Sequence, residues 1–553
     1  MSEQKAVRQS TPGFHLARVS ALLLWGAASL ACGPETSTGK AGMISGTVAA
    51  DRGTVWGFQV KARDITHRIT YTVFTRSGNY RIPNLLPGSY EVRVAQKGFE
   101  SPVHKVELKA GQSQLLDLKL TAVAVPPSQA PWLSPDRDDV EMVDYDQLYP
   151  PGPGREALES ACMSCHGRFI FHRQAWPEEV WRHHADRMSA PGGSIPHLSE
   201  HTKSVVVSYL SKNFGPDSVR RELKLDNFQV DEEEISKAIY IEYDLAPPKE
   251  GKRRLHDPYP AADGTIWYTD TGANSILRLD PREPDFQKRV KDYPTPTPQA
   301  GLHGLTIDSR GHVYWSEMLG GHLGEFNPET EKFTSHKFPT PGAMLQVIVD
   351  SQDKVWYNLA RGNKIGKLDA RSRQISQWDI PTVDSFAYGL VADQEDRIWW
   401  SAIAQHRIGS FDPQTQELTE YPTPTQPSGP RRLSVDSQGK IWVAYFFGQA
   451  LGVFDPKSGE WKEHKYPLRY SQGYDAWTDA DDNVWVTESA YDSLVKFDQK
   501  TQEFTYYPLP QTGGLPGVPK IEIDAQGTIW FGYRDSPSIT AVAFKPNGNT
   551  VTE

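Results

Sequence analysis

From residue 237 to residue 553, the chain repeats one short pattern of hydrophobic and polar positions. Each copy passes through a turn with Gly or Asp to an aliphatic residue and then an aromatic one. The seven aromatic residues are Trp267, Tyr314, Trp356, Trp399, Trp442, Trp485 and Trp530. A spacing of roughly 40–45 residues with about four short strands per unit is typical of β-propeller blades. The pattern therefore predicts seven blades.

The last unit of this array lacks the outer strand with which the first six units end. A segment of the same type, Tyr243 with its neighbours at 241–245, stands upstream of the first unit. We expect it to complete the seventh blade, because closing the ring removes the open sheet edges.

The part before the propeller changes character three times. Residues 43–122 alternate hydrophobic and polar positions between Gly/Pro turns, which predicts a small β-sandwich. Residues 123–153 are rich in proline and acidic residues, as in an extended linker. Residues 154–215 have helical periodicity, with three expected helices. The predicted fold class is a multidomain, mainly β protein: a small β-sandwich, a small all-α cytochrome c domain and a seven-bladed β-propeller.

Composition narrows the function and the location. The 553 residues carry a net charge of −10, which argues against a nucleic-acid-binding protein. Residues 1–32 read as an export signal, with positive residues before the apolar run 21–28. Small residues precede Cys32, as at a bacterial lipoprotein cleavage site, so we favour lipidation of Cys32 over an ordinary secretory signal. We expect an exported protein, periplasmic or in the outer envelope, that meets a membrane only through this N-terminal lipid.

The other two of the three cysteines stand in the motif Cys162-Met163-Ser164-Cys165-His166. This motif resembles the attachment site of c-type cytochromes, in which two thiols hold the haem and the adjacent histidine binds its iron. The resemblance implies a covalent haem c on Cys162 and Cys165, with His166 as an iron ligand. Zinc is disfavoured because it would need two further ligands and no other cysteine is nearby.

The second ligand of the haem iron is either a methionine or a second histidine. Met188 follows Val180, Trp181 and His184 at helical spacing, and this stripe would face the haem. We therefore place Met188 first. Ligation by a second histidine is the alternative, and the nearby candidates are His172, His183, His184, His197 and His201.

Two positions of the propeller repeat should lie near its axis, one at the start of each innermost strand and one directly after its end. In both, the residue type differs between blades, and many are ionisable. The predicted pocket residues are His256, His303, Tyr388, Arg431 and Tyr474 in the first set, and Asp270, Glu317 and Glu488 in the second. Convergent polar residues at a channel mouth indicate a ligand or metal site. Arg431 would bind a carboxylate or another anion.

Two families resemble parts of the chain. Tyr80, Tyr90 and the turn 86–89 resemble the carboxypeptidase regulatory-like domain, which implies a sandwich without catalysis. The segments 302–305, 363–368 and 388–390 resemble virginiamycin B lyase (streptogramin lyase), a seven-bladed propeller that opens a cyclic ester by elimination with Mg²⁺. The resemblance implies catalytic roles for His303 and Glu317, which would hold Mg²⁺ or another divalent ion. A second histidine of that pattern is missing, since Gly320 stands in its place.

These observations leave three hypotheses. The first is a haem-linked oxidoreductase in which the propeller binds a small molecule or a periplasmic redox partner. The second is a metal-dependent C–O lyase of the streptogramin lyase type. The third is a non-catalytic envelope binding protein. We favour the first, because an elimination needs no electrons and would leave the haem unexplained.

Overall fold

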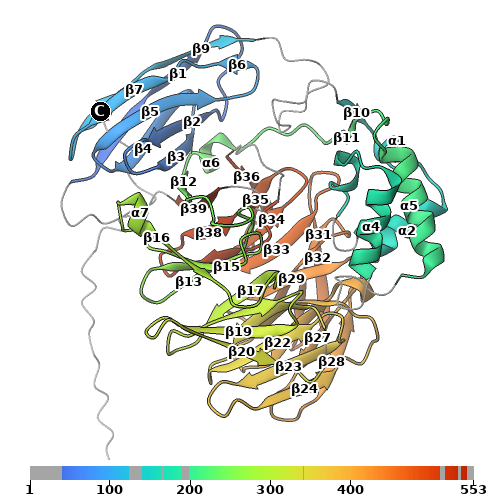
Figure 1. Cartoon of the computed structure of the whole chain (residues 1–553). Helices are drawn as coiled ribbons and strands as arrows, with labels where there is room; N and C mark the ends of the chain where they lie inside the picture. The colour runs from blue at the N-terminus through green and yellow to red at the C-terminus, as the bar shows by residue number, and fades with distance from the viewer. Residues whose placement is uncertain are drawn as a thin grey trace, which may run out of the picture.

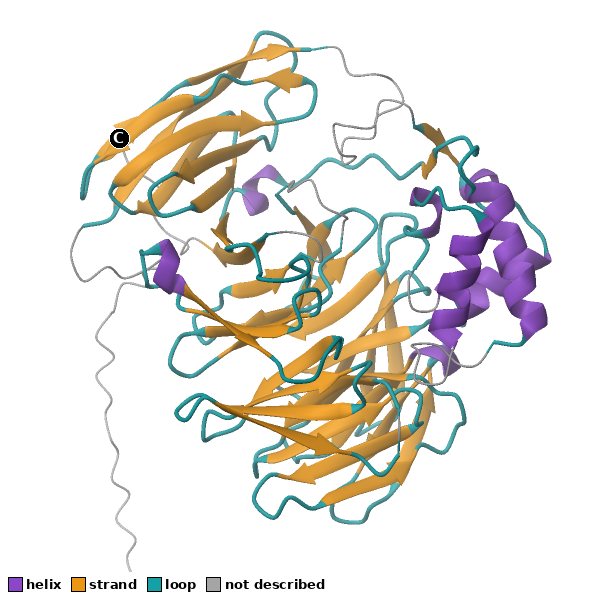
Figure 2. Cartoon of the chain, viewed as in Figure 1, coloured by secondary structure: helices purple, strands orange, loops and turns teal. Residues whose placement is uncertain are grey.

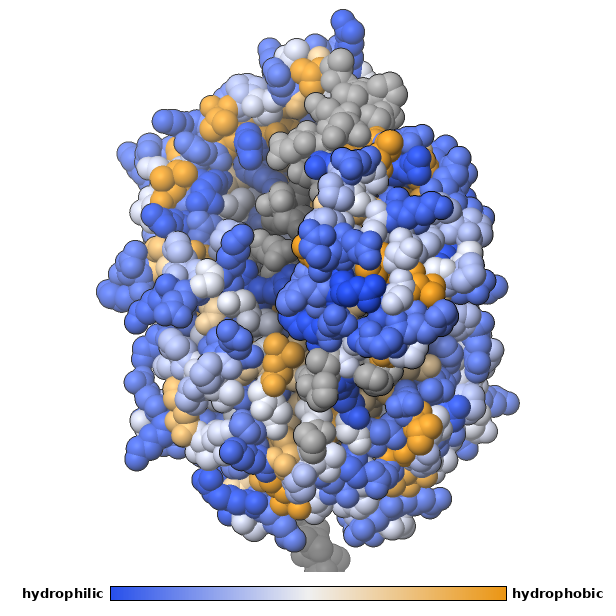
Figure 3. All heavy atoms as spheres, turned by 45° about the vertical axis from the view of Figure 1, so that its right-hand side comes forward, coloured by the Kyte–Doolittle hydropathy of each residue, from blue (hydrophilic) through white to orange (hydrophobic). Residues whose placement is uncertain are grey.

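The computed structural model describes residues 40–123, 140–163, 167–189, 198–340, 342–510, 517–533 and 537–544. Figure 1 shows the N-terminal strands above the propeller and the helices beside it, and Figure 2 shows how strongly strands predominate. On the face in Figure 3, hydrophobic residues form small separate patches on a largely hydrophilic surface. No helix in the described part is long and apolar enough to cross a membrane.

The N-terminal unit is a β domain with two sheets. One sheet has the order β4-β1-β9-β6, with β8 beside β1, and the other contains the run β3-β2-β5-β7. The strands are β1 (Gly42–Ala50), β2 (Gln59–Asp64), β3 (Ile69–Phe74), β4 (Asn79–Leu85), β5 (Gly88–Ala95), β6 (Phe99–Glu100), β7 (His104–Leu108), β8 (Ser113–Leu115) and β9 (Leu118–Ala122). In β5, the alternation of the sequence buries Tyr90, Val92 and Val94.

Six four-stranded antiparallel sheets form the first six blades, and their first strands contact one another around the axis. Their strands are β13 (Leu255–Pro260), β14 (Ile266–Asp270), β15 (Ser275–Leu279), β16 (Val290–Pro294); β17 (Leu302–Ile307), β18 (Val313–Glu317), β19 (His322–Asn327), β20 (Lys332–Lys337); β21 (Met344–Val349), β22 (Lys354–Leu359), β23 (Lys364–Asp369), β24 (Ile375–Asp379); β25 (Ala387–Ala392), β26 (Ile398–Ala402), β27 (Arg407–Phe411), β28 (Leu418–Pro422); β29 (Pro430–Val435), β30 (Ile441–Tyr445), β31 (Ala450–Asp455), β32 (Glu460–Lys465); β33 (Gly473–Thr478), β34 (Val484–Glu488), β35 (Ser493–Asp498) and β36 (Glu503–Pro508). The predicted propeller is confirmed.

The repeated sequence pattern has a clear local cause. The turn residue before each aliphatic-aromatic pair is Gly or Asp because its φ is positive, as for Gly439 (φ 81°) and Asp482 (φ 64°). In the last six units, an aspartate six residues before the aromatic residue fixes the turn. Asp436, for example, accepts a hydrogen bond from Trp442 Nε1 (2.9 Å) and two from backbone N–H groups.

The seventh blade combines both ends of the propeller sequence. It contains β37 (Ile521–Ile523), β38 (Ile529–Gly532), β39 (Ser538–Phe544) and, as its fourth strand, β12 (Ala238–Asp244). β12 runs antiparallel to β39, so the predicted closing strand is confirmed.

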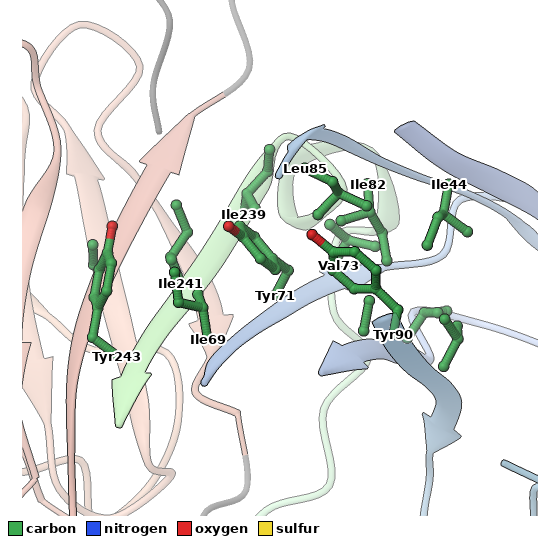
Figure 4. Close-up of a cluster of buried hydrophobic side chains, with 14 of the residues drawn as sticks. Ile44, Ile69, Tyr71, Val73, Ile82, Leu85, Tyr90, Ile239, Ile241 and Tyr243 are labelled. Carbon is green, nitrogen blue, oxygen red and sulfur yellow. The ribbon is translucent and has the colours of Figure 1, made fainter. Parts of the chain in front are cut away.

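The outer edge of β12 is also paired, which the sequence did not indicate. It runs antiparallel to β3 of the N-terminal domain, so that blade seven and that domain share one eight-stranded sheet. Figure 4 shows Ile239 and Ile241 of β12 beside Ile69 and Tyr71 of β3. All four belong to one buried cluster that extends from the sandwich into the propeller. Arg63 and Asp244 add an ion pair across the junction (2.6 Å).

The predicted all-α cytochrome c domain is wrong. The structure is mainly β, its six α-helices make up 12% of it, and no such domain is evident in the described residues. The segment contains α1 (Tyr145–Leu148), α2 (Pro153–Ala161), the 3₁₀ turn η1 (Phe171–Arg173), α4 (Glu178–Ser189) and α5 (Glu200–Phe214), together with the parallel strands β10 (Glu141–Val143) and β11 (Arg221–Leu223). Three short elements lie elsewhere: α6 (Glu232–Ile235), α7 (Phe286–Arg289) and the 3₁₀ turn η2 (Ile403–Gln405).

The physical reason for this correction is that the helices do not close a core of their own. Trp181, Val207 and Leu210 pack in a cluster that also includes Leu223 of β11 and Tyr491 of the propeller. We therefore describe residues 140–225 as a helical segment that packs on the propeller, not as an independent all-α unit.

Candidate functional site

A β-bulge near the start of each inner strand shapes the axis of the propeller. In the first blade, the pairing of β13 with β14 shifts between Leu255 and Pro258, and five further blades have the same irregularity. The shift covers two consecutive residues, which in the first blade are His256 and Asp257. Because of the bulge, both residues make contacts with other blades.

Five of the predicted pocket residues come together at this point, and we call them the axial cluster: His256, His303, Tyr388, Arg431 and Tyr474. The His256 and His303 rings lie 3.8 Å apart between centroids. His303 Nε2 is 3.2 Å from Tyr388 Oη, which is 2.5 Å from Tyr474 Oη. Arg431 Nη2 donates to Tyr388 Oη (3.1 Å), and its guanidinium lies over the ring of Tyr474 (3.6 Å).

The hydrogen bonds of the two histidines define their tautomers. His303 Nδ1 is 2.6 Å from the Leu345 carbonyl oxygen, which can only accept, so Nδ1 carries the proton and Nε2 has a lone pair towards Tyr388. Burial, followed by the neighbouring His256, holds the pKa of His303 well below its usual range. His303 is therefore neutral at physiological pH and can accept a proton at Nε2.

Asp257 orients the second histidine. It accepts a hydrogen bond from His256 Nδ1 (2.7 Å) and from Arg432 Nη2 (2.9 Å). Burial alone would raise the pKa of Asp257, but Arg432, Lys520 and His256 together hold it below its usual range. Asp257 and Arg432 were not predicted, because the sequence pattern assigned only one residue at the start of each inner strand to the axis. The bulge that brings in the second is visible only in the strand pairing.

Two carboxylates of the second predicted set, Asp270 and Glu488, accept hydrogen bonds from the backbone N–H groups of nearby loops. Asp270 accepts from three backbone N–H groups and from Arg253 Nη1 (3.0 Å). Glu488 accepts from the backbone N–H groups of Gln472, Ala490 and Tyr491. Burial raises the pKa of Glu488 to about 7. These contacts give both residues a structural role in the turns.

Glu317 is the third carboxylate of that set. It accepts from Trp315 Nε1 (3.3 Å), and its Oε2 lies 3.6 Å from His322 Nδ1. Burial raises the pKa of Glu317. His322, two residues after Gly320, therefore lies beside this carboxylate.

A different set of residues has the geometry of a metal site. His256, Asp257 and His303 are buried, and one potential ligand atom from each lies within 4.8 Å of the others. Two imidazoles with one carboxylate suit first-row transition metals better than Mg²⁺, which prefers oxygen ligands. The geometry therefore pairs His303 with His256 and Asp257, where the sequence paired it with Glu317.

An apolar wall surrounds the axial cluster. Tyr388 and Tyr474 pack in one buried cluster with Leu345, Ala360, Phe386, Ile403 and Phe446. A pocket with a few polar groups in an apolar wall suits a small organic molecule.

The helical segment packs beside this site from two directions. Arg168 N donates to Gln472 Oε1 (3.4 Å), and Gln472 stands two residues before Tyr474. On the other side, Arg361 Nη2 donates to the Met188 carbonyl (3.5 Å). Gly167 and Arg168 directly follow the Cys162–His166 motif in sequence, so the chain contacts blade six just after the motif.

The predicted haem ligands are only partly described. Cys165, His166 and His197 lie outside the described residues, as does the predicted lipidation site Cys32. Cys162 follows α2 directly, and Met188 is half-buried on α4. His183 and His201 are exposed, and His184 stacks on Trp176.

His172 is the buried histidine of this segment. Its Nδ1 is 2.9 Å from Tyr149 Oη and its Nε2 is 2.8 Å from Glu222 Oε2, so iron binding would have to break one of these contacts. Trp181 Nε1 is buried without a hydrogen-bond partner among the described residues. A haem propionate would provide such a partner, and Cys162 packs against the same apolar cluster.

These features define a β-propeller of seven blades with a buried polar site at one end of its axis and a helical segment beside that site. A Virginiamycin B lyase family domain is found at residues 240–474, and a Carboxypeptidase regulatory-like domain at residues 43–121. Both predicted resemblances are thereby confirmed at the level of domains. A comparison with curated protein sequences gives no match.

Solved structures support the propeller fold. Virginiamycin B lyase from Staphylococcus aureus is 21% identical with a TM-score of 0.51, and the match covers 56% of this chain and 99% of that one. A streptogramin B lyase is 22% identical with a TM-score of 0.50, covering 56% and 98%. A catalytically inactive virginiamycin B lyase from S. aureus with quinupristin is 20% identical with a TM-score of 0.50, covering 55% and 99%. At these identities the similarity establishes the fold alone.

Proposed function

We propose that the chain is an exported c-type haem protein whose propeller binds a small molecule at the axial cluster, and that electrons pass between this molecule and a haem attached to Cys162 and Cys165. The contact between Arg168 and Gln472 supports this most, because it joins the segment after the motif to the strand that carries Tyr474. The periplasm or outer envelope is the proposed location, with the lipid on Cys32 as its anchor.

The axial cluster would bind an anionic or carbonyl oxygen. Arg431 offers a cation flanked by the rings of Tyr388, Phe446 and Tyr474. Its charge and the two tyrosine hydroxyl groups would orient the ligand, while the neutral His303 Nε2 would take up a proton from it. When bound, haem c supplies one-electron transfer.

The Arg431→Gln variant tests this proposal. Small hydroxy acids and phenols are added without oxygen to the ferric protein, and haem reduction is followed by absorption. A compound that reduces the wild-type haem should reduce the variant at least about tenfold more slowly, since a charge-assisted hydrogen bond contributes about 1.5–3 kcal/mol. Equal rates with every compound that reduces the wild type would remove Arg431 from the ligand site.

The arrangement of His256, Asp257 and His303 favours a second candidate, a metal-dependent C–O lyase. In this mechanism His256, Asp257 and His303 would hold a divalent ion that stabilises the negative charge developing on the ester oxygen, and Glu317 would act as the base. Linear product from quinupristin is measured by chromatography after incubation with Mg²⁺, Mn²⁺ or Zn²⁺. Metal-dependent opening that is lost in His303→Ala supports the lyase. Its absence with all three ions removes this candidate, and a wild type that also shows no haem reduction would indicate the non-catalytic binding protein.

A further inference from the structure

The axial channel widens into a large cavity at the end opposite the axial cluster. The cavity has a volume of about 2000 Å³ and reaches from the turns after the inner strands inwards to the middle of the channel. None of the five residues of the axial cluster lines it. It is therefore a separate space, closed towards the axial cluster by the residues around Asp257.

Buried charged groups form the inner end of this cavity. Arg432, Lys520, Asp475 and Glu522 all line it, and each is less than 7% exposed. Lys520 Nζ lies 2.5 Å from Glu522 Oε1 and 3.8 Å from Asp257 Oδ2. Such a concentration of buried charge in an open cavity is costly, which points to a function in ligand binding.

Both cations retain the capacity to bind a further group. Arg432 donates through Nη2 to Asp257 and through Nη1 to Gln346, but its buried Nε has no hydrogen-bond partner among the described residues. The ammonium group of Lys520 lies 5.6 Å from the ring centroid of Trp477, which also lines the cavity. An acceptor with negative charge would satisfy Arg432 Nε and interact with Lys520.

Glu522 and Asp475 repel an anionic ligand less when they are protonated. Burial raises the pKa of Glu522 to about 7, although Lys520 opposes this, and raises that of Asp475 to about 6. The charged groups that act on Glu522 are Lys520, Asp475 and Asp257. A negatively charged ligand would stabilise the protonated form of Glu522, so that binding takes up a proton.

We propose that this cavity is a second binding site, which takes a small organic carboxylate with an apolar or aromatic body. The carboxylate binds at Arg432 Nε and Lys520 Nζ. The body of the ligand lies against Trp477 and the apolar residues Ile348, Leu390 and Val391, which line the same cavity. The site does not depend on the haem or on the function of the axial cluster.

Benzoate is the probe, and isothermal titration calorimetry of the full-length protein at pH 6 and pH 8 is the measurement. We expect the site at Lys520 to bind benzoate about tenfold more tightly at pH 6 than at pH 8, with uptake of up to one proton in the more alkaline range. The reason is that a group that titrates near pH 7 changes its protonated fraction about tenfold over this interval. The Glu522→Gln variant should lose most of this pH dependence while it still binds.

Two variants test whether benzoate binds in this cavity. Lys520→Met should weaken benzoate binding at pH 6 at least about tenfold, and Trp477→Leu weakens it without changing a charge. Arg52→Gln, which removes an exposed arginine of the N-terminal domain, is the control and should bind benzoate as the wild type does. Unchanged benzoate affinity in Lys520→Met at both pH values would place the ligand elsewhere and overturn the proposal. Absence of binding by the wild type at both pH values would overturn it as well. Neither result bears on the haem or on Arg431-dependent haem reduction.

Discussion

Replacing Ile241 with aspartate is expected to destabilise the N-terminal β domain and the propeller together, by about 4 kcal/mol or more. Ile241 is 4% exposed and stands in β12, between Tyr71 of β3 and Ala541 of β39. The variant loses a buried aliphatic side chain, which costs about 2–5 kcal/mol, and places an unpaired charge in the shared core. Because β12 belongs to both units, neither can keep its contacts when this strand is lost.

Denaturant unfolding followed by tryptophan fluorescence measures this effect. Val219→Asp is the matched control, since it introduces the same charge at a position that is 63% exposed, and its stability should stay within about 0.5 kcal/mol of the wild type. A loss below about 1 kcal/mol in Ile241→Asp, or an unfolding transition of one unit that moves alone, would contradict the shared sheet.

The second large effect is expected at the haem motif. Cys162→Ala combined with Cys165→Ala should abolish covalent haem when the chain is exported together with haem-maturation factors, because no thioether bond can then form. The wild type should keep its colour after extraction with acidified acetone. Cys165→Ala alone should lose most of it.

Cys32→Ala is the control for this experiment, since it removes the third cysteine without touching the motif. It should retain the haem, although its membrane association is expected to fall. Wild-type protein whose haem is fully extractable would show that the motif does not attach haem.

The sequence was sufficient for the propeller because its signals are local. A left-handed turn residue and an alternating inner strand recur in each unit, and in the last six units an aspartate binds the following tryptophan or tyrosine. Their period alone therefore counts the blades. The closing strand at Tyr243 followed from the missing strand of the last unit. The pairing of β12 with β3 has no local signal, since it joins an edge to a strand more than 160 residues away in sequence.

Of the two residues that each bulge brings to the axis, the sequence predicted the first and not the second. The five residues of the axial cluster were predicted because polar residues that differ between blades at one repeat position are not explained by packing. These residues are His256, His303, Tyr388, Arg431 and Tyr474. Asp257 and Arg432 were missed because a bulge is a property of strand pairing. Asp270 and Glu488 were assigned to the pocket, but a carboxylate at a strand end serves equally well to accept the backbone N–H groups of a turn. Likewise, helical periodicity predicts helices but cannot tell whether they close a separate core, and here Tyr491 of the propeller completes it.

The adjacency of the haem motif and the axial cluster is tested most directly by the midpoint potential of the haem, measured by spectroelectrochemical titration. The variants are Arg431→Gln and, as control, Arg52→Gln, which removes an exposed arginine of the N-terminal domain. A nearby positive charge favours the reduced haem, and a buried charge is screened less than an exposed one. We therefore expect a lower midpoint potential in Arg431→Gln and an unchanged one in Arg52→Gln. The same potential in all three proteins would contradict an axial site that lies beside the haem.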